Sequence, residues 1–456
     1  MNLDVIILAA GQGTRMRSSL PKVLHPVAGR PMLQHVVDTA RELSPAAIHV
    51  VVGHGAEAVS AAMAGQALNW VRQEQQLGTG HAVLQAMPAV DAANTVLVLY
   101  GDVPLLSAET LRALVEQGQD APALLTARVA DPTGYGRILR DANGALRGVV
   151  EHKDATAEQL QIAEINSGVL AAPASDLNKY LPAVGNANSQ GEYYLPDVLA
   201  MAVAEGHPVQ TQLAGSELEI LGINDRLQLS QVEREFQLRQ AHSLLREGVS
   251  VADPARLDIR GSLQCGQGVS IDVNVVIEGN VILGDGVTVG PNCVLRNTEV
   301  AAGATIHAMS HLEEALVGIR ASVGPYARLR PGTVLAEEAR IGNFVETKKA
   351  KIGVGSKVNH LTYIGDCEMG DGVNVGAGTI TCNYDGVNKH QTRLGDGVFI
   401  GSNSTLVAPL EVADGGFVGA GSTVTRAVDV NELAVSRARQ RNIAGWQRPG
   451  KKDGEG

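Results

Sequence analysis

The residues best suited to chemistry lie in two places, the first of them near the N-terminus. An apolar run that ends at Ala10 is followed by the loop "GQGTRM", which contains Arg15, and Lys22 stands a few residues later. Backbone N–H groups of such a loop and two cationic side chains suit a polyphosphate. Met16 stands where a dinucleotide fingerprint has its third glycine, and no Gly-Lys-Ser/Thr follows, which excludes a P-loop. Without the cations, an ordinary strand-to-helix turn would explain the loop equally well.

A second group of polar residues surrounds position 360. His360 stands in "VNHLTYIGD", and the segment "GAGTITCNYDGVNKHQTRLG" follows at 376–395. Imidazole is the side chain best suited to accept a proton near neutral pH, so His360 is a candidate general base. A solvated surface histidine is the simpler interpretation of His360 alone. The neighbouring segments "TCNYDG" and "RLRPG" favour the interpretation of His360 as a general base.

Residues 1 to about 226 must position the first group. Strand-like apolar runs alternate there with helix-like segments, which predicts an α/β Rossmann-like domain with a mostly parallel sheet covered on both faces. Ligands bind such sheets outside the carboxyl ends of the strands, where the glycine loop and Asp102 both lie. The predicted strands are 4–10, 48–53, 95–102 and 122–129, and the predicted helices are 31–44 and 107–118, the second with Ser107 as N-cap.

From residue 251 onward aliphatic residues recur every six positions. The three runs are Ile271, Ile277, Leu283, Val289, Leu295; Val317, Val323, Leu329, Leu335, Ile341; and Leu394, Ile400, Leu406, Val412, Val418, Val424. Period six is the signature of a parallel β-helix, in which each short strand places one aliphatic side chain in a narrow interior. This interior explains why the chain has 52 glycines and only 3% aromatic residues. The repeat fails between Val375 and Leu394, and insertions in solenoids often serve the binding face.

The two halves are joined by a predicted linking helix at 227–247. Leu229, Val232 and Phe236 fall on one face of this helix, and Gly248 ends it. The expected organisation is therefore a first domain at 1–226, a helical linker at 227–247, and a β-helix domain with a C-terminal tail at 248–456.

Composition limits the possible partners. The 456-residue chain has a net charge of -11, which argues against a nucleic-acid partner, because such partners need a basic surface. No apolar run approaches the roughly 18 residues of a spanning helix, so membrane insertion is not expected. The four cysteines are widely spaced and form no Cys-x-x-Cys pair, which gives no zinc or redox motif. A cytoplasmic location fits these features.

The motifs of both halves together resemble a known enzyme family. "LAAGQGTRM" followed by "PK" is similar to the signature of sugar-phosphate nucleotidyltransferases. The likeness extends along the chain through "QEQQLGTGHA", "YGDVPLL", "DPTGYGRI", "VEHKDA", "EINSGV", "GEYYLPD", "GINDRLQL" and "NYDG". The chain is identified as a member of the bifunctional family that makes UDP-N-acetylglucosamine. The resemblance implies a left-handed β-helix, a handedness that periodicity alone does not show.

For the first site, the resemblance implies uridylyl transfer. A sugar 1-phosphate oxygen attacks the α-phosphorus of UTP and pyrophosphate leaves, so the protein aligns anions and neutralises charge. Arg15 and Lys22 match the catalytic positions, and Asp102 and Asn224 match the Mg²⁺ ligands. The positions that match UTP or UDP-sugar binding are Leu8, Gly11, Lys22, Gln73, Gly78, Thr79, Tyr100, Gly136, Glu151, Asn166 and Asn224.

For the second site, the resemblance implies transfer of an acetyl group from acetyl-CoA to glucosamine 1-phosphate, with His360 as the base. The positions that match glucosamine 1-phosphate binding are Arg330, Lys348, Tyr363 and Asn374. The positions that match acetyl-CoA binding are Ala377, Asn383, Tyr384, Ser402, Ala420 and Arg437.

The partners expected from the resemblance are these small-molecule substrates and further copies of the chain. A homotrimer is expected, with acetyl sites built from more than one subunit. Two alternatives stay open at this point. One is a single-function nucleotidyltransferase with a structural β-helix. The other is an inactive scaffold, although Arg15, Lys22 and Asp102 are all present.

Overall fold

A computed structural model describes residues 2–449; the C-terminal tail at 450–456 lies outside the described residues. The chain forms two compact units, Met1–Gln240 and Ala241–Gly456. The division falls inside helix α7 (Arg226–Arg246), which occupies the place of the expected linker at 227–247. Val232 of α7 is buried in unit 1, whereas Ala241 and Leu244 belong to the core of unit 2.

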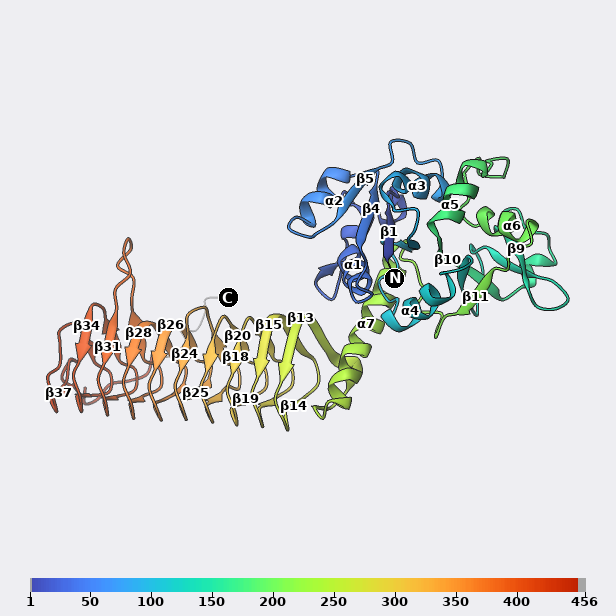
Figure 1. Cartoon of the computed structure of the whole chain (residues 1–456). Helices are drawn as coiled ribbons and strands as arrows, with labels where there is room; N and C mark the ends of the chain where they lie inside the picture. The colour runs from blue at the N-terminus through green and yellow to red at the C-terminus, as the bar shows by residue number, and fades with distance from the viewer. Residues whose placement is uncertain (1, 450–456) are drawn as a thin grey trace, which may run out of the picture. The chain divides into compact units, whose positions relative to one another are not determined.

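Unit 1 is built on a nine-stranded mixed sheet of order β11-β7-β10-β6-β1-β4-β5, with β8 and β9 attached at β10 (Figure 1). The strands are β1 (Leu3–Ala9), β4 (Ala47–Val52), β5 (Asn69–Arg72), β6 (Thr95–Tyr100), β7 (Ala123–Arg128), β8 (Arg137–Arg140), β9 (Leu146–Val150), β10 (Glu164–Pro173) and β11 (Gln210–Leu213). β1 is parallel to β4 and β6, and β10 is antiparallel to β6 and β7. The carboxyl ends of β1 and β6 therefore lie side by side at the predicted phosphate loop.

Helices cover both faces of this sheet. They are α1 (Met32–Arg41), α2 (Ala56–Ala62), α3 (Thr79–Ala86), α4 (Ala108–Gln117), α5 (Ala174–Tyr180) and α6 (Asp197–Ala204). Two separate apolar clusters lie on opposite sides of β1, because alternate residues such as Ile6 and Ile7 point to opposite faces. The Ser107 side chain accepts from Thr110 N–H, which confirms the predicted N-cap of α4.

Unit 2 is a parallel β-helix with three strand ladders, here called faces 1, 2 and 3. Face 1 contains β12 (Ser250–Val251), β14 (Ser270–Ile271), β16 (Thr288–Val289), β19 (Thr305–Ile306), β22 (Ser322–Val323), β25 (Arg340–Asn343), β27 (Lys357–His360), β29 (Asn374–Val375), β32 (Phe399–Ile400), β35 (Phe417–Val418) and β37 (Leu433–Ala434). Face 2 contains β13 (Leu257–Cys265), β15 (Val275–Leu283), β17 (Val294–Arg296), β20 (His311–Glu313), β23 (Arg328–Leu329), β26 (Glu346–Ile352), β28 (Tyr363–Met369), β30 (Ile380–Cys382), β33 (Thr405–Val407) and β36 (Thr423–Val424). Face 3 contains β18 (Glu299–Val300), β21 (Leu316–Val317), β24 (Val334–Leu335), β31 (Thr392–Leu394), β34 (Leu410–Val412) and the second halves of β15, β26 and β28.

The six-residue repeat determines this architecture. Three repeats complete one coil, so that Ile271 pairs with Val289 of the next coil. The aliphatic residues of all three predicted runs are buried in one continuous core. The fold class predicted for both halves is thereby confirmed.

One loop interrupts the coils. Pairing between successive coils joins residues 17 apart at Tyr363 and Ile380 but 25 apart at Cys367 and Thr392. The additional residues form a hairpin-like loop at 383–391, which projects from the corner between faces 2 and 3 (Figure 1, orange). This loop lies within the segment where the sequence repeat fails.

Candidate active sites

The first site is a cavity of about 240 Å³ at the carboxyl ends of β1 and β6. Eight of the predicted residues line it: Leu8, Gly11, Lys22, Gln73, Gly78, Thr79, Tyr100 and Asp102. Ala9, Ala10, Val23, Gln76, Ala82 and Glu192 also line it and were not predicted. The predicted loop and strand-end residues therefore surround a single space, as expected for adjacent parallel strands.

The two loop glycines have different roles. Gly13 has φ +63, and a Cβ there would stand 2.6 Å from Cβ of Lys22, so the stem of Lys22 packs directly on the Gly13 backbone. Gly11 has nothing within 4 Å of the position of a Cβ and borders the cavity. Gly13 is thus required to place Lys22, whereas Gly11 leaves room for a ligand.

Lys22 joins the two predicted metal ligands. Its ammonium forms an ion pair with Asp102 and donates a 2.9 Å hydrogen bond to Oδ1 of Asn224. Nδ2 of Asn224 donates to the carbonyl of Gly222, which turns the amide oxygen toward Lys22. One carboxylate and one amide oxygen therefore already face a single cationic group.

This donor set fits a divalent cation. Mg²⁺ prefers oxygen ligands and uses one or two protein groups beside waters and substrate phosphates. Within residues 2–449, no three His, Cys, Asp or Glu side chains gather as a metal site, so a metal here would take its remaining ligands from substrate and water. Asp102 and Asn224 would hold it.

Gln73 is a buried amide beside the cavity. Its Nε2 donates to Nδ1 of His81 at 2.9 Å and to the carbonyl of Gly78 at 3.3 Å. His81 thus orients Gln73, a role that the sequence analysis missed, because spacing does not show which side chain supports another. With Nε2 engaged, Oε1 of Gln73 is left to accept from a ligand.

The segment around Tyr193 holds Gly78 and Thr79 in place. Gly80 N–H donates to the carbonyl of Tyr193, Tyr193 N–H donates to the carbonyl of Leu77, and Leu195 N–H donates to Oγ1 of Thr79. Gly78 has φ +115, and a Cβ there would lie 2.6 Å from the Tyr193 carbonyl oxygen. Only glycine fits at this position, because backbone atoms occupy the space.

Three further predicted residues lie together beside Tyr100. A Cβ on Gly136 would be 2.9 Å from Oε1 of Glu151, and Asn166 N–H donates to the carbonyl of Gly136. Burial, followed by the charges of Asp102 and Glu151, raises the pKa of the Tyr100 hydroxyl, which therefore stays protonated. Arg15 is exposed outside the cavity, and its side chain forms no hydrogen bond or ion pair within residues 2–449.

The second group is arranged along one corner of the β-helix. His360 ends β27, and its Nδ1 lies 2.9 Å from Oδ1 of Asn343 in the preceding coil. Because an amide oxygen only accepts, the proton is on Nδ1 and Nε2 has a free lone pair. Asn343 thus sets the tautomer that a base requires, and no pattern in the sequence marks Asn343 as the partner of His360.

Arg330 and Lys348 interrupt a pattern of alternating charge on face 2. Arg260, Glu278, Arg296 and Glu313 stand at equivalent positions of successive coils. The same register continues to Arg330 and then to Lys348, so two cations become neighbours. Arg330 pairs with Glu346 at 2.8 Å and Lys348 with Asp366 at 3.7 Å, yet two adjacent cations still offer several donors to one anion, which makes this position a candidate anion site.

Tyr363 completes this anion site. The next position of the column is Gly365, where a Cβ would lie 2.4 Å from the Tyr363 hydroxyl and 2.8 Å from Nδ2 of Asn383. Both side chains occupy the space that Gly365 leaves empty. Asn383 also donates to Asp366, which lies 3.7 Å from Nζ of Lys348.

Four of the six predicted acetyl-CoA residues form a row that starts beside His360. Ala377, Ser402, Ala420 and Arg437 follow one another on successive coils at the corner between faces 1 and 2, and Arg437 donates to the carbonyl of Ala420. Four coil steps of about 4.8 Å give a row of roughly 19 Å. Such a row suits a long extended ligand.

Two predicted residues of the second site lie elsewhere. Tyr384 is exposed in the 383–391 loop at the other corner of face 2. Asn374 lies on face 1, where it pairs with Phe399 and Lys357. One chain therefore does not bring Asn374 to the face that carries Arg330, Lys348 and Tyr363.

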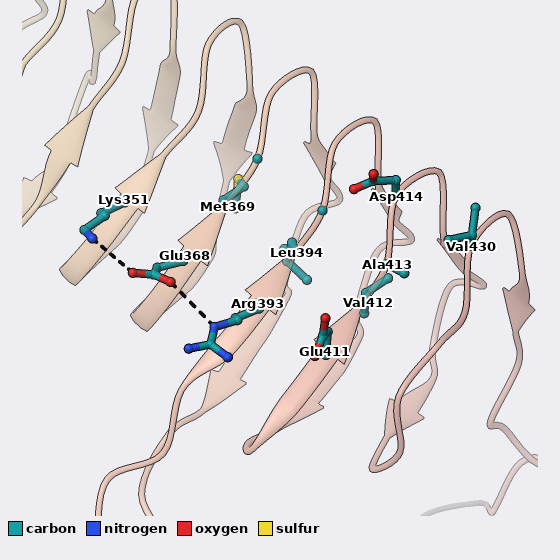
Figure 2. Close-up of a pocket in the computed structure, with 12 residues that line it drawn as sticks. Lys351, Glu368, Met369, Arg393, Leu394, Glu411, Val412, Ala413, Asp414 and Val430 are labelled. Atoms are coloured by element: carbon teal, nitrogen blue, oxygen red, sulfur yellow. Dashed lines mark hydrogen bonds and ion pairs between the residues drawn. The ribbon is translucent and has the colours of Figure 1, made fainter.

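A larger hollow of about 590 Å³ lies on face 3 and contains none of the predicted residues. Its charged residues already neutralise one another: Glu368 joins Lys351 at 3.0 Å and Arg393 at 3.6 Å (Figure 2). This alternation is the arrangement that face 2 loses at Arg330 and Lys348. Because three carboxylates (Glu368, Glu411 and Asp414) and only two cations line the hollow, it is a poorer site for an anion.

Known proteins match the whole chain. Residues 5–164 match the family described as "MobA-like NTP transferase domain", and residues 259–346 match "GMPPB C-terminal domain". The "Bifunctional protein GlmU" of Marinobacter nauticus is 58% identical over 450 residues, 98% of this chain and 99% of that protein. The "Bifunctional protein GlmU" of Stutzerimonas stutzeri is 56% identical over 453 residues, which cover 99% of this chain and 100% of that protein.

This chain belongs to the GlmU family. A solved nucleotidyl transferase of Methanothermobacter thermautotroptrophicus covers 52% of the chain and 99% of its own length at 23% identity, with a TM-score of 0.38.

Membership of the GlmU family makes the chain a bifunctional transferase that acts on small molecules, including nucleotides, with a divalent metal. The prediction that the protein is an enzyme is confirmed. The alternative of an inactive scaffold does not agree with membership of this enzyme family. No helix among the described residues is both long and apolar enough to span a membrane.

We expect Lys22→Met to bind a divalent cation more tightly when no nucleotide is present. The Lys22 ammonium competes for Asp102 and Asn224, and its removal should raise the affinity for Mn²⁺ at least about tenfold. Free Mn²⁺ would be measured by electron paramagnetic resonance. Lys179→Met is the matched control, because Lys179 also pairs with a carboxylate, Glu205, away from the cavity. Weaker binding by Lys22→Met would show that Lys22 does not occupy the cation site.

Proposed function

We propose that the enzyme first acetylates glucosamine 1-phosphate with acetyl-CoA. It then transfers UMP from UTP to N-acetylglucosamine 1-phosphate, with Mg²⁺ as the metal, and releases pyrophosphate. The observation that carries this proposal is that each compact unit holds its own candidate site, within a chain that matches a bifunctional protein along its full length.

The alternative is a nucleotidyltransferase whose β-helix only assembles subunits. A structural β-helix has no need for an orienting partner at His360, nor for two neighbouring cations on face 2. The hydrogen bond from His360 to Asn343 and the adjacent positions of Arg330 and Lys348 favour the acetyltransferase.

In the proposed uridylyl transfer, the chain positions and neutralises anions. Mg²⁺ held by Asp102 and Asn224 would offset charge on the phosphates. The bond from a sugar-phosphate oxygen to the α-phosphorus forms while the bond to pyrophosphate breaks, so no protein nucleophile is needed. Lys22 and the exposed Arg15 stabilise the charge that develops on the leaving group. Oε1 of Gln73 accepts from N3–H of uracil.

In the proposed acetyl transfer, Nε2 of His360 accepts the proton of the 2-amino group as nitrogen bonds to the thioester carbon. The C–S bond then breaks, and CoA leaves as the thiol when Nε2–H of His360 returns the proton to the sulfur. Arg330 and Lys348 hold the sugar phosphate through charge-assisted hydrogen bonds. The small side chains of Ala377 and Ala420 leave the row beside His360 open to the pantetheine arm.

A homotrimer with shared acetyl sites is part of the proposal. Asn374 and Arg330 lie on different faces of one chain, so a second chain would have to supply Asn374 to a substrate bound on face 2. A cytoplasmic location also belongs to the proposal. The four cysteines are free thiols, as expected in a reducing compartment.

The test of the two activities uses one reaction mixture. With glucosamine 1-phosphate, acetyl-CoA, UTP and Mg²⁺, Asp102→Ala should lose pyrophosphate release by about 10²-fold or more while CoA release continues. His360→Ala should lose CoA release by roughly 10²- to 10⁴-fold. Adding N-acetylglucosamine 1-phosphate should restore pyrophosphate release to His360→Ala. If the wild-type enzyme never releases CoA, the acetyltransferase half of the proposal is wrong and the β-helix only assembles subunits.

The shared site predicts complementation between inactive chains. Arg330→Ala and Asn374→Ala each remove one contribution from every site of a uniform trimer. If the two residues come from different chains, mixing the variants through reversible dissociation should create some sites with both residues. CoA release should then reappear. Size-exclusion chromatography with light scattering checks the trimer, and mixtures that stay inactive would place both residues in one chain.

Glu151 predicts a pH dependence of sugar binding. Burial, followed by Asp197, Asp154 and Glu192, raises the pKa of Glu151. The ionised carboxylate of Glu151 can accept hydrogen bonds from sugar hydroxyls at both oxygens. The protonated acid has one oxygen occupied by a proton and is a poorer acceptor. The KM for N-acetylglucosamine 1-phosphate should therefore rise as pH falls toward the raised pKa. Asp197→Asn lowers that pKa and should move the rise to lower pH, whereas the exposed control Asp120→Asn should not. If the three enzymes had the same pH profile of KM, Glu151 would not be the group whose protonation weakens sugar binding.

A further inference from the structure

The 383–391 loop is organised around one carboxylate. Oδ1 of Asp385 accepts from the N–H groups of Val387 at 2.8 Å and Asn388 at 2.6 Å, while Oδ2 lies 2.7 Å from Nε2 of His390. The N–H of Asp385 donates to the carbonyl of Asn388. These bonds close the loop without help from an apolar core, since Val387 at its tip is 83% exposed.

His390 connects the end of this loop to its beginning. Its N–H donates to the carbonyl of Asn383 at 2.8 Å, and its ring holds Asp385. Tyr384 lies between these two contacts and pairs with Lys389 as an antiparallel bridge. The two residues expected to contact acetyl-CoA, Asn383 and Tyr384, therefore stand inside a closed ring of hydrogen bonds that includes the His390 side chain.

The root of the loop is anchored separately. Asn383 is buried and donates to Asp366 of the preceding coil, so it remains attached when the tip changes. Tyr384 has no comparable anchor. It is 57% exposed, its hydroxyl bonds to Gly386 of the same loop, and the Lys389 ammonium lies 5.6 Å from its ring centroid. The position of Tyr384 thus depends on the conformation of the loop.

The charges around His390 are mixed. His390 shares a hollow of about 320 Å³ with Lys349, Lys351, Lys389, Asp366 and Glu368. Glu368 is already paired with Lys351 and Arg393, and Asp366 with Asn383. Asp385 is thus the carboxylate that the ring contacts. The hydrogen bond from His390, followed by the Asn388 and Val387 N–H groups, holds the pKa of Asp385 well below its usual range.

We propose that His390 is a positioning residue for the acetyl donor: by holding Asp385, it keeps the 383–391 loop closed and Tyr384 in place to contact acetyl-CoA bound along the row of a neighbouring chain in the proposed trimer. This inference rests on the proposed acetyltransferase function. His390 itself need not touch the substrate. Losing it should therefore weaken donor binding rather than the chemical step at His360.

The test compares His390→Ala, His390→Gln and the control Arg393→Ala. Glutamine offers an N–H near the position of Nε2 and should retain the bond to Asp385, whereas alanine removes it. Arg393 follows the loop on β31 and makes an exposed ion pair with Glu368 but takes no part in the loop's hydrogen bonds. It controls for the loss of a surface contact nearby.

We expect His390→Ala to raise the KM for acetyl-CoA about three- to fivefold, the size of effect typical of an exposed ion pair, with less than a twofold change in kcat. His390→Gln should recover most of this loss, and Arg393→Ala should match the wild type. Pyrophosphate release from UTP should be unchanged in all three. Chymotrypsin should cleave after Tyr384 faster in His390→Ala only.

Three results would overturn the inference: an unchanged KM in His390→Ala, a fall in kcat alone, or a glutamine variant no better than alanine. An altered KM without faster cleavage at Tyr384 would also overturn it, because His390 would then act without holding the loop. A wild-type enzyme that frees no CoA would instead refute the proposed acetyltransferase, and the inference with it.

Discussion

The register between successive coils is the constraint on which the second half of the molecule depends. Parallel strands pair residue by residue, so each position of a coil lies directly above the same position of the next coil. Side chains that are 17 or 18 residues apart in sequence become neighbours about 4.8 Å apart. A row of equivalent positions is therefore a continuous surface, and its chemistry is set by one residue from each coil.

This stacking explains how a repetitive fold can carry a specific site. On face 2 the charges alternate from Arg260 to Glu313 and neutralise one another, which costs little. The alternation stops at Arg330 and Lys348, and Gly365 follows with no side chain at all. Arg330 and Lys348 lie next to each other there, paired with Glu346 and Asp366, beside an opening filled only by Tyr363 and Asn383. Two adjacent cations at one position of the repeat therefore distinguish this part of face 2 from the alternating charges of the earlier coils.

In unit 1, too, charged and polar groups at the candidate site pair with one another. The carboxyl ends of β1 and β6 bring the glycine loop and the Asp102 carboxylate to the same cavity. Without a ligand, Lys22 satisfies both Asp102 and Asn224. The Lys22 ammonium thus occupies the place that a divalent cation bound to Asp102 and Asn224 would take. Gly13 makes this possible because its missing side chain lets the stem of Lys22 pack against the loop.

The sequence by itself determined the fold class and eight of the fourteen residues that line the cavity of unit 1. Periodicity reports burial directly, so the six-residue repeat and the alternation of strands and helices were sufficient, and even the Ser107 cap was predicted correctly. Only the tertiary structure decided which residues support the others. Asn343 and His81 orient His360 and Gln73 through contacts made after folding, and neither occurs in a pattern that marks a partner. Only the tertiary structure shows that Asn374 lies on face 1, because the sequence alone does not show which side of a coil a residue occupies. Local patterns encode what each residue prefers, whereas the geometry of a site depends on contacts between segments that only the folded chain brings together.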